Sequence, residues 1–106
     1  MKYLLLLCGD ETDTQVEVLP GCAEWQADLA ARGAFVTAVG LHPPKTAATI
    51  RVRDDEVLLT DGPFAETKEQ MGGFSIIECD SAEEAHRIAA THPWARIGSI
   101  EVRQLV

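Results

Sequence analysis

The chain predicts a single α+β domain: one antiparallel sheet with two helices on the same face. Two observations carry this prediction. The predicted elements follow the order β-α-β, an inserted hairpin, then β-α-β, within 106 residues. Each of the two helical segments has one apolar stripe, which suits a helix that covers a sheet from one side. The order of elements is that of a ferredoxin-like domain.

The first predicted strand, residues 2–8, is apolar on both faces. Side chains alternate along a strand, so each face takes three of them. One face holds Tyr3, Leu5 and Leu7, and the other holds Leu4, Leu6 and Cys8. A single layer of helices cannot cover both faces of a sheet. We therefore expect a homodimer packed sheet against sheet, with the first of these two sets on or beside the interface.

Two segments carry the signals of helix ends. Residues 20–32 begin at Pro20, which suits a first helical turn, and stop before Gly33, a common terminator. The second helix begins with a capping box formed by Ser81 and Glu84 and runs to about Thr91.

The remaining segments predict strands. Residues 34–41, 73–79 and 99–105 complete the main sheet, while residues 47–53 and 56–60 form the inserted hairpin. The hairpin tip is Asp54-Asp55. Because aspartate tolerates left-handed geometry less well than glycine does, the tip leaves the turn type open.

This topology gathers unusual residues at one end of the sheet. The first strand ends there and the third begins there at Gly72-Gly73, where we expect a bulge or a close backbone approach. The hairpin leaves and rejoins the sheet at the same end, and the second helix ends there near His92. A protonated His92 would suit the negative end of that helix.

The stretch Thr60–Gln70 has the features of a functional loop. Asp61-Gly62-Pro63 is strong turn chemistry, Phe64 is an apolar anchor, and Lys68 lies among further charges. This stretch resembles the signature of the DGPF-domain, or YCII-related, family. Further blocks resemble the same family in the same order: Met1–Leu7, Gly9–Glu11, Ala48–Asp54, Gly72–Phe74 and Ser99–Arg103. The resemblance covers the whole chain, 1–106, and implies a dimeric α/β barrel.

His42 and Asp61 are the candidate catalytic residues. A histidine beside a carboxylate acts as a general acid or base, with the carboxylate fixing its tautomer. The alternatives are an exposed loop histidine and a carboxylate that only holds the turn. Phe64 and Lys68 are candidate ligand contacts, with Tyr3 or Trp94 as a wall. Lys68 pairing with an acidic neighbour, and tryptophans in the core, are the competing interpretations.

Composition limits the other possibilities. The net charge of −8 opposes binding to a nucleic acid backbone. The first apolar run is too short to span a membrane and has no cleavage-type site after it, so we expect a cytoplasmic protein. The three cysteines lack metal-like spacing, and we expect reduced thiols. Asp10, Glu11 and Asp13 lack regular ligand spacing, and we expect neither a metal nor another cofactor.

Two functions stay open at this point, beside a purely structural dimer that binds no ligand. The resemblance implies proton chemistry of the lyase, isomerase or dehydrochlorinase kind on a small polar molecule, without a cofactor. It also implies an alternative, a non-catalytic ligand-binding or regulatory module associated with extracytoplasmic-function sigma factors. The residues alone do not decide whether the chain is an enzyme.

Overall fold

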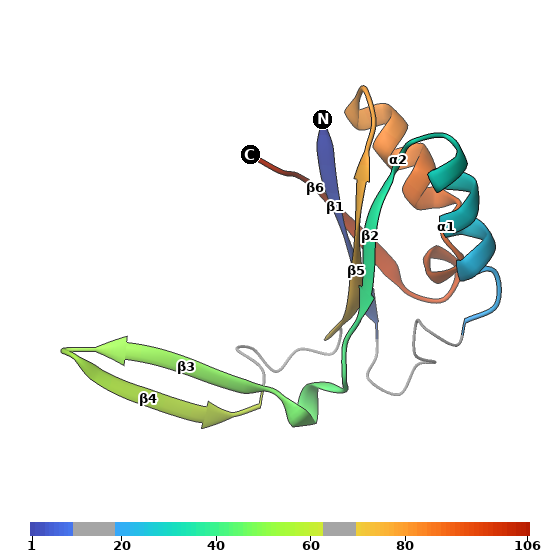
Figure 1. Cartoon of the computed structure of the whole chain (residues 1–106). Coiled ribbons are helices and arrows are strands. Elements are labelled where there is room, and N and C mark those ends of the chain that lie inside the picture. The colour runs from blue at the N-terminus through green and yellow to red at the C-terminus, as the bar shows by residue number, and fades with distance from the viewer. Residues whose placement is uncertain (10–18, 63–69) are drawn as a thin grey trace.

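A computed structural model describes residues 1–9, 19–62 and 70–106. Its main sheet is antiparallel, with the strand order β2-β5-β1-β6. The strands are β1 (Lys2–Gly9), β2 (Phe35–Gly40), β5 (Gln70–Glu78) and β6 (Ser99–Gln104). Helices α1 (Cys22–Ala31) and α2 (Ala82–Ala90) lie on the same face of this sheet (Figure 1). The predicted ferredoxin-like α+β fold is confirmed.

Short elements complete the chain. The 3-10 turns are η2 (Pro44–Thr46) and η3 (Pro93–Arg96), and the inserted hairpin is β3 (Ala48–Arg53) with β4 (Glu56–Asp61). Within the described ranges, no helix is both long and apolar enough to cross a membrane.

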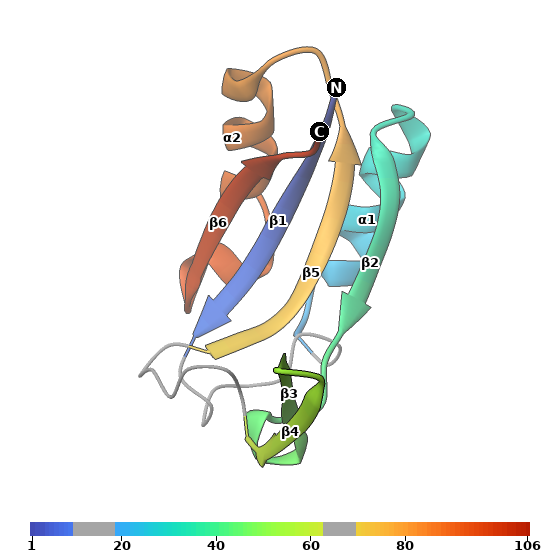
Figure 2. The same ribbon diagram turned by 90° about the vertical axis from the view of Figure 1, so that its left-hand side faces the viewer.

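The core lies between the sheet and the helices. Tyr3, Leu5 and Leu7 point into it and are at most 3% exposed. Leu4 and Leu6 lie on the opposite face, which has no helix over it, and are only partly buried (Figure 2). The expected place of Tyr3, Leu5 and Leu7 at a subunit interface is therefore wrong. Alternation fixes which residues share a face, but it does not say which face the helices take.

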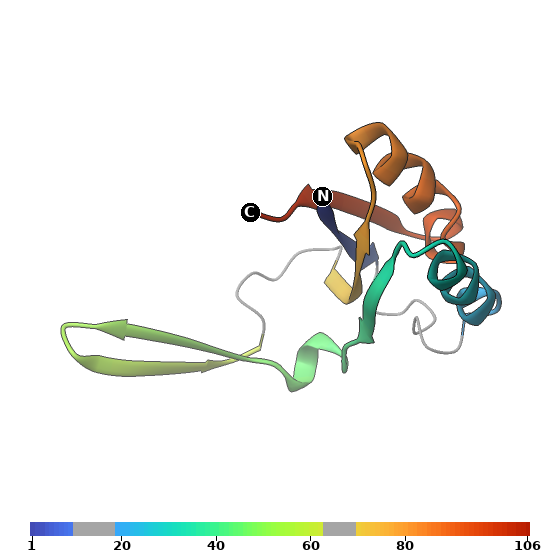
Figure 3. The ribbon, with the colours of Figure 1, turned by 45° about the horizontal axis from the view of Figure 1, so that its top comes forward.

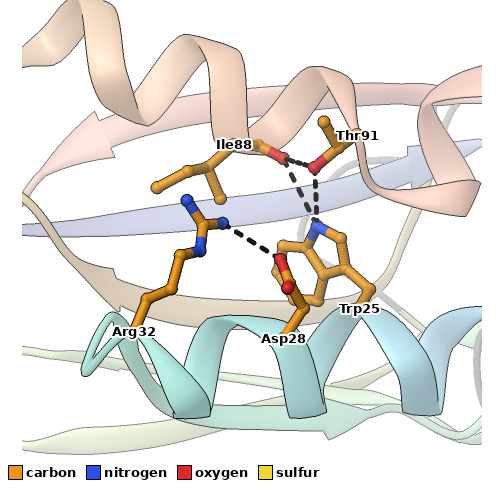
Figure 4. A network of polar contacts seen from close by, with 5 residues as sticks. All are labelled: Trp25, Asp28, Arg32, Ile88 and Thr91. Carbon is orange, nitrogen blue, oxygen red and sulfur yellow. Dashed lines mark hydrogen bonds and ion pairs between the residues drawn. The ribbon is translucent and has the colours of Figure 1, made fainter.

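The two helices are joined by a small polar network (Figure 4). The Trp25 indole Nε1–H points to the Thr91 hydroxyl at 3.1 Å and to the Ile88 carbonyl at 3.4 Å. The Thr91 hydroxyl donates in turn to the same carbonyl at 2.7 Å. An exposed ion pair joins Asp28 of α1 to Arg32, which directly follows the helix, at 3.4 Å. Trp25 thus adds a donor to the carbonyl end of α2 while burying its ring in the core.

The predicted capping of α2 is confirmed, with one shift. The Ser81 hydroxyl accepts the Glu84 N–H at 3.1 Å. The Glu84 carboxylate accepts the N–H of Asp80 at 3.2 Å, one residue before the position that a standard capping box uses.

The β3–β4 hairpin stands apart from the sheet. It projects on the side away from the helices, and the longest dimension of the molecule is 47 Å (Figures 1 and 3). Its tip is closed by Asp54 and Asp55, both with positive φ, at 51° and 65°. Positive φ at both central residues is the type I′ turn, which matches the twist of a hairpin. The open question about the turn is thus answered.

Candidate functional site

A cavity of about 300 Å³ lies between α1 and the sheet. Its apolar wall comes from the strands β1 and β2 and from α1, through Leu7, Ala38 and Ala23 among others. Its polar groups are Gln26, Ser75 and His92, together with the Cys22 thiol. The cavity is small for a ligand pocket but within the usual range, and it combines an apolar lining with a few polar groups.

His92 is the most unusual of these residues. It follows α2, and the next residue is Pro93, which turns the chain out of the helix. Its Nδ1 accepts the backbone N–H of Trp94 at 2.9 Å, so the neutral ring carries its proton on Nε2. The ring makes an edge-to-face contact with the Trp25 ring, with the ring centroids 4.4 Å apart. Backbone and core together fix the direction of this imidazole.

Burial determines the charge of His92. The side chain is 2% exposed, and burial lowers its pKa to about 4. The ring is therefore neutral at neutral pH, since desolvation disfavours the charged form. The expected protonated histidine at the end of the helix is wrong. The nearby Ile88 carbonyl of α2 instead accepts hydrogen bonds from Trp25 and Thr91.

Ser75 and His92 are the two buried polar residues of the described chain, and both line the cavity. Within the described residues, neither the Ser75 hydroxyl nor Nε2 of His92 has a hydrogen-bond partner. Every fully buried side-chain nitrogen or oxygen of the described residues has a hydrogen-bond partner. The Ser75 hydroxyl and the His92 Nε2 are therefore not fully buried, and they reach the open space of the cavity that both residues line. Buried polar groups normally have partners. A ligand or solvent in the cavity would supply them.

Cys22 lines the same cavity as a thiol. Burial raises its pKa, and the charge of Glu24 raises it further. The thiolate is the nucleophilic form of cysteine, so this environment does not activate Cys22. No disulfide is formed by Cys8, Cys22 or Cys79.

Close backbone contacts shape this end of the sheet. The pairing of β1 with β5 skips Gly72, because Leu7 pairs with Gly73 and Cys8 pairs with Met71. A side chain at Gly73 would place its Cβ 2.6 Å from the carbonyl oxygen of Val39 on β2. Both the expected bulge and the expected close approach at these glycines are present.

His42 and Asp61 both lie at the hairpin end of the sheet, and both are exposed. Asp61 ends β4 opposite Ala48, and the hairpin base is closed by the Gly62 N–H donating to the Ala47 carbonyl at 2.8 Å. Within the described residues, no hydrogen bond or ion pair joins His42 to Asp61. The predicted dyad therefore stays a prediction.

The other predicted ligand contacts fall in different places. Phe64 and Lys68 lie outside the described residues. Tyr3 is buried at the opposite end of β1, where it pairs with Ile77. Trp94 is 3% exposed, and its indole N–H donates to the Cys8 carbonyl at 2.9 Å. Trp94 thus lies at the expected end, where it ties η3 to the end of β1.

Comparison with known proteins identifies the family. The model of the YCII-related domain matches residues 1–106. The chain belongs to the YCII-related family. An uncharacterized protein of Rhizobium meliloti (strain 1021) is 36% identical over 114 residues, covering 99% of this chain and 92% of that protein.

A solved structure supports the fold of this YCII-related domain. It is the 5-chloro-2-hydroxyhydroquinone dehydrochlorinase TftG of Burkholderia phenoliruptrix, in complex with 2,5-dihydroxybenzoquinone. The TM-score is 0.54 with 15% sequence identity, and the match covers 100% of this chain and 94% of TftG. At that identity the likeness concerns the fold alone.

Ser75 and the cavity-facing role of His92 were not found by sequence reasoning. His92 continues the apolar stripe of α2, which ends in Ile88 and Ala89, and a histidine on such a stripe is directed into the core. That signal was present in the YCII-related sequence. Ser75 gives no comparable signal, because a serine in a strand faces solvent as readily as a cavity.

Proposed function

We propose that the cavity between α1 and the sheet binds a small oxygenated ring compound and that the protein promotes proton transfer on it without a cofactor. The observation that carries this proposal is His92, a buried, neutral imidazole whose Nε2–H faces the cavity with no partner in the described chain. Such a group donates to a carbonyl or hydroxyl oxygen.

A neutral imidazole suits this work better than a charged one. Its N–H is aimed in advance, because Nδ1 is held by the Trp94 N–H. A donor held in a fixed direction stabilises negative charge developing on a ligand oxygen. The Ser75 hydroxyl and the Gln26 amide are further polar groups on the same cavity. The apolar wall that includes Leu7 and Ala38 suits the faces of a ring.

The likeness to TftG supports the choice of ligand class. That protein is a dehydrochlorinase of a hydroxylated hydroquinone and was solved with 2,5-dihydroxybenzoquinone, a flat ring bearing oxygens. The two folds match over the whole of this chain. A ring of this size is compatible with a cavity of about 300 Å³.

We propose His42 as the proton acceptor, with Asp61 fixing its tautomer and with Phe64 and Lys68 from the following loop as ligand contacts. Gly40 lines the cavity, and His42 lies two residues further along the chain. A ligand proton would move to His42 while His92 stabilises the charge left on the ligand oxygen. We also propose a homodimer that covers the outer face of the sheet, and a cytoplasmic location. The association with sigma factors stays a prediction.

Binding and proton exchange of 2,5-dihydroxybenzoquinone and related hydroxyquinones test this proposal. His92→Asn retains an acceptor for the Trp94 N–H but lacks the Nε2–H donor. We expect it to bind the ring compound about tenfold more weakly, the effect of losing one hydrogen bond. His86→Asn, at an exposed position of α2, is the matched control and should bind like the wild type. Calorimetric titration measures both affinities.

Turnover is a separate readout. His42→Ala should bind the compound normally but lose the exchange of its ring protons with deuterated solvent, followed by NMR. Equal affinity in wild type and His92→Asn would overturn the proposed site. Binding without any exchange in the wild type would favour the non-catalytic binding module instead.

A further inference from the structure

The β3–β4 hairpin, residues 48–61, carries an apolar face that nothing in the described chain covers. Ile50 is paired with Leu59 and Val52 with Val57, and directly paired residues share a face. These four side chains are 62%, 65%, 56% and 66% exposed, in the order Ile50, Leu59, Val52, Val57. The other face holds Thr49 with Thr60, Arg51 with Leu58, and Arg53 with Glu56. The hairpin is therefore an amphipathic arm with its apolar side unused.

A second apolar surface of the same chain is also uncovered. The outer face of the main sheet has no helix over it (Figure 2). At its centre, Leu4 is paired with Ile76 and Leu6 with Phe74, and all four are only partly buried. At its β6 edge the same face carries the ion pair of Glu101 and Arg103. An apolar centre with a charged rim is the pattern of a protein–protein interface.

The arm projects on the side of this outer face. In Figures 1 and 3 the helices lie on one side of the sheet and the arm extends to the other. Each strand of the arm has six residues. At about 3.3 Å per residue the arm is about 20 Å long, whereas two sheets packed face to face lie only about 10 Å apart. A second sheet on the outer face therefore cannot avoid the arm.

We infer that the arm packs its apolar face on a second copy of this chain, extending past the end of the partner's sheet. This inference rests on the proposed homodimer. It adds a second contact to the packing of sheet on sheet, in which the arm of each subunit lies on the other subunit, and we call this contact the clasp. In a two-fold symmetric dimer each arm holds the other subunit, so both apolar arm faces are buried together.

The surface required for a stable dimer supports the clasp. Four strands of six to nine residues give a sheet face of only about 450 Å² in outline, from the strand spacing and rise. A standard interface buries about 800 Å² on each partner. The sheet face alone falls short of that value. The arm, about 20 Å long and two strands wide, supplies a large part of the remainder.

Sedimentation velocity over a micromolar concentration series tests the inference on the full chain. Leu59→Glu places a charge on the apolar face of the arm. It should weaken dimerisation at least tenfold, which is the effect expected when a residue buried in an interface is disrupted. Leu58→Glu makes the same change one residue earlier, on the face shared with Arg51. It should leave the dimer unchanged. Circular dichroism confirms that both variants are folded.

A third variant separates the arm from the sheet. Leu6→Lys alters the outer face of the sheet and should dissociate the dimer whether or not the arm takes part. A dimer that survives Leu59→Glu but not Leu6→Lys would overturn the clasp and leave the proposed homodimer standing. A wild-type monomer throughout the series would overturn both. Equal weakening by Leu58→Glu and Leu59→Glu would also contradict an interface limited to one arm face.

Discussion

The two faces of the sheet differ in how the chain covers them. The inner face is finished within one chain, because the helices bury Tyr3, Leu5 and Leu7 to 3% exposure or less. The outer face and the arm are left open, with Val57 and Leu59 about two-thirds exposed. Both faces are built from alternating residues of the same strands. An apolar pattern therefore shows which side chains favour burial, whereas the elements packed around them decide which of these side chains are buried within the chain.

The largest effect is expected on the inner face. Leu5 is fully buried, so Leu5→Ala removes apolar contacts and leaves a cavity, at a cost of about 3–4 kcal/mol of unfolding free energy. Leu6→Ala, on the outer face, should cost far less in a dilute monomer. Urea denaturation of both variants at low concentration measures the difference. Equal losses of unfolding free energy would show that the two faces are equally buried in the monomer, contrary to the difference in burial described above.

The buried histidine predicts how stability changes with pH. The pKa of His92 is lowered to about 4 in the folded protein from an ordinary value of 6.5. The unfolded chain therefore binds the proton more readily between these values. The stabilising contribution is present above pH 6.5 and is lost as the pH falls toward 4, by about 3 kcal/mol in total.

His92→Asn isolates this contribution. It keeps an acceptor for the Trp94 N–H but cannot titrate, while the carboxylates of both proteins titrate alike. The difference in unfolding free energy between the two proteins should change between pH 6.5 and 4, measured by chemical denaturation at each pH. A constant difference over this range would mean that His92 is as accessible to protons as in the unfolded chain.

A smaller loss of stability is expected at Gly73, where β5 lies close to the backbone of β2. Gly73→Ala would place a methyl group 2.6 Å from the Val39 carbonyl oxygen, and that atom belongs to the backbone. Either β2 or β5 must shift, at a cost of about 2 kcal/mol, as for other overpacked positions. Thermal unfolding measures the loss. Because Gly73 lies beside the cavity residues Leu7 and Gly40, ligand affinity should fall as well. An unchanged melting temperature would show that this contact is loose.

The smallest effect concerns the tip of the arm. Asp55→Gly relieves a left-handed conformation that costs a non-glycine residue about 1 kcal/mol. If the arm is docked in a dimer, this gain should appear as a higher melting temperature. In the Leu6→Lys background the arm would have nothing to pack on, and the gain should vanish. A gain of the same size in both backgrounds would place the arm within the folding unit of the monomer.

Much of the fold follows from local signals in the sequence. The capping residues Ser81 and Glu84 mark the start of α2, and the repeated apolar positions mark both helices and strands. The residues of the candidate site could be predicted from the sequence less completely than the fold. Trp94 lies at the expected end of the sheet, but the residues that line the cavity come from five separate segments of the chain. A motif within one loop cannot report such a set.

The order of elements, the alternation of β1 and the inserted hairpin could all be predicted from the amino-acid sequence, because they depend on neighbours within a few residues. Tertiary structure decided which face of β1 is the core, and it made His92 a neutral donor directed into a cavity. The physical reason is that burial and the pKa values it shifts depend on everything packed around a group. For His92 that environment includes Trp25, which is 67 positions earlier in the numbering.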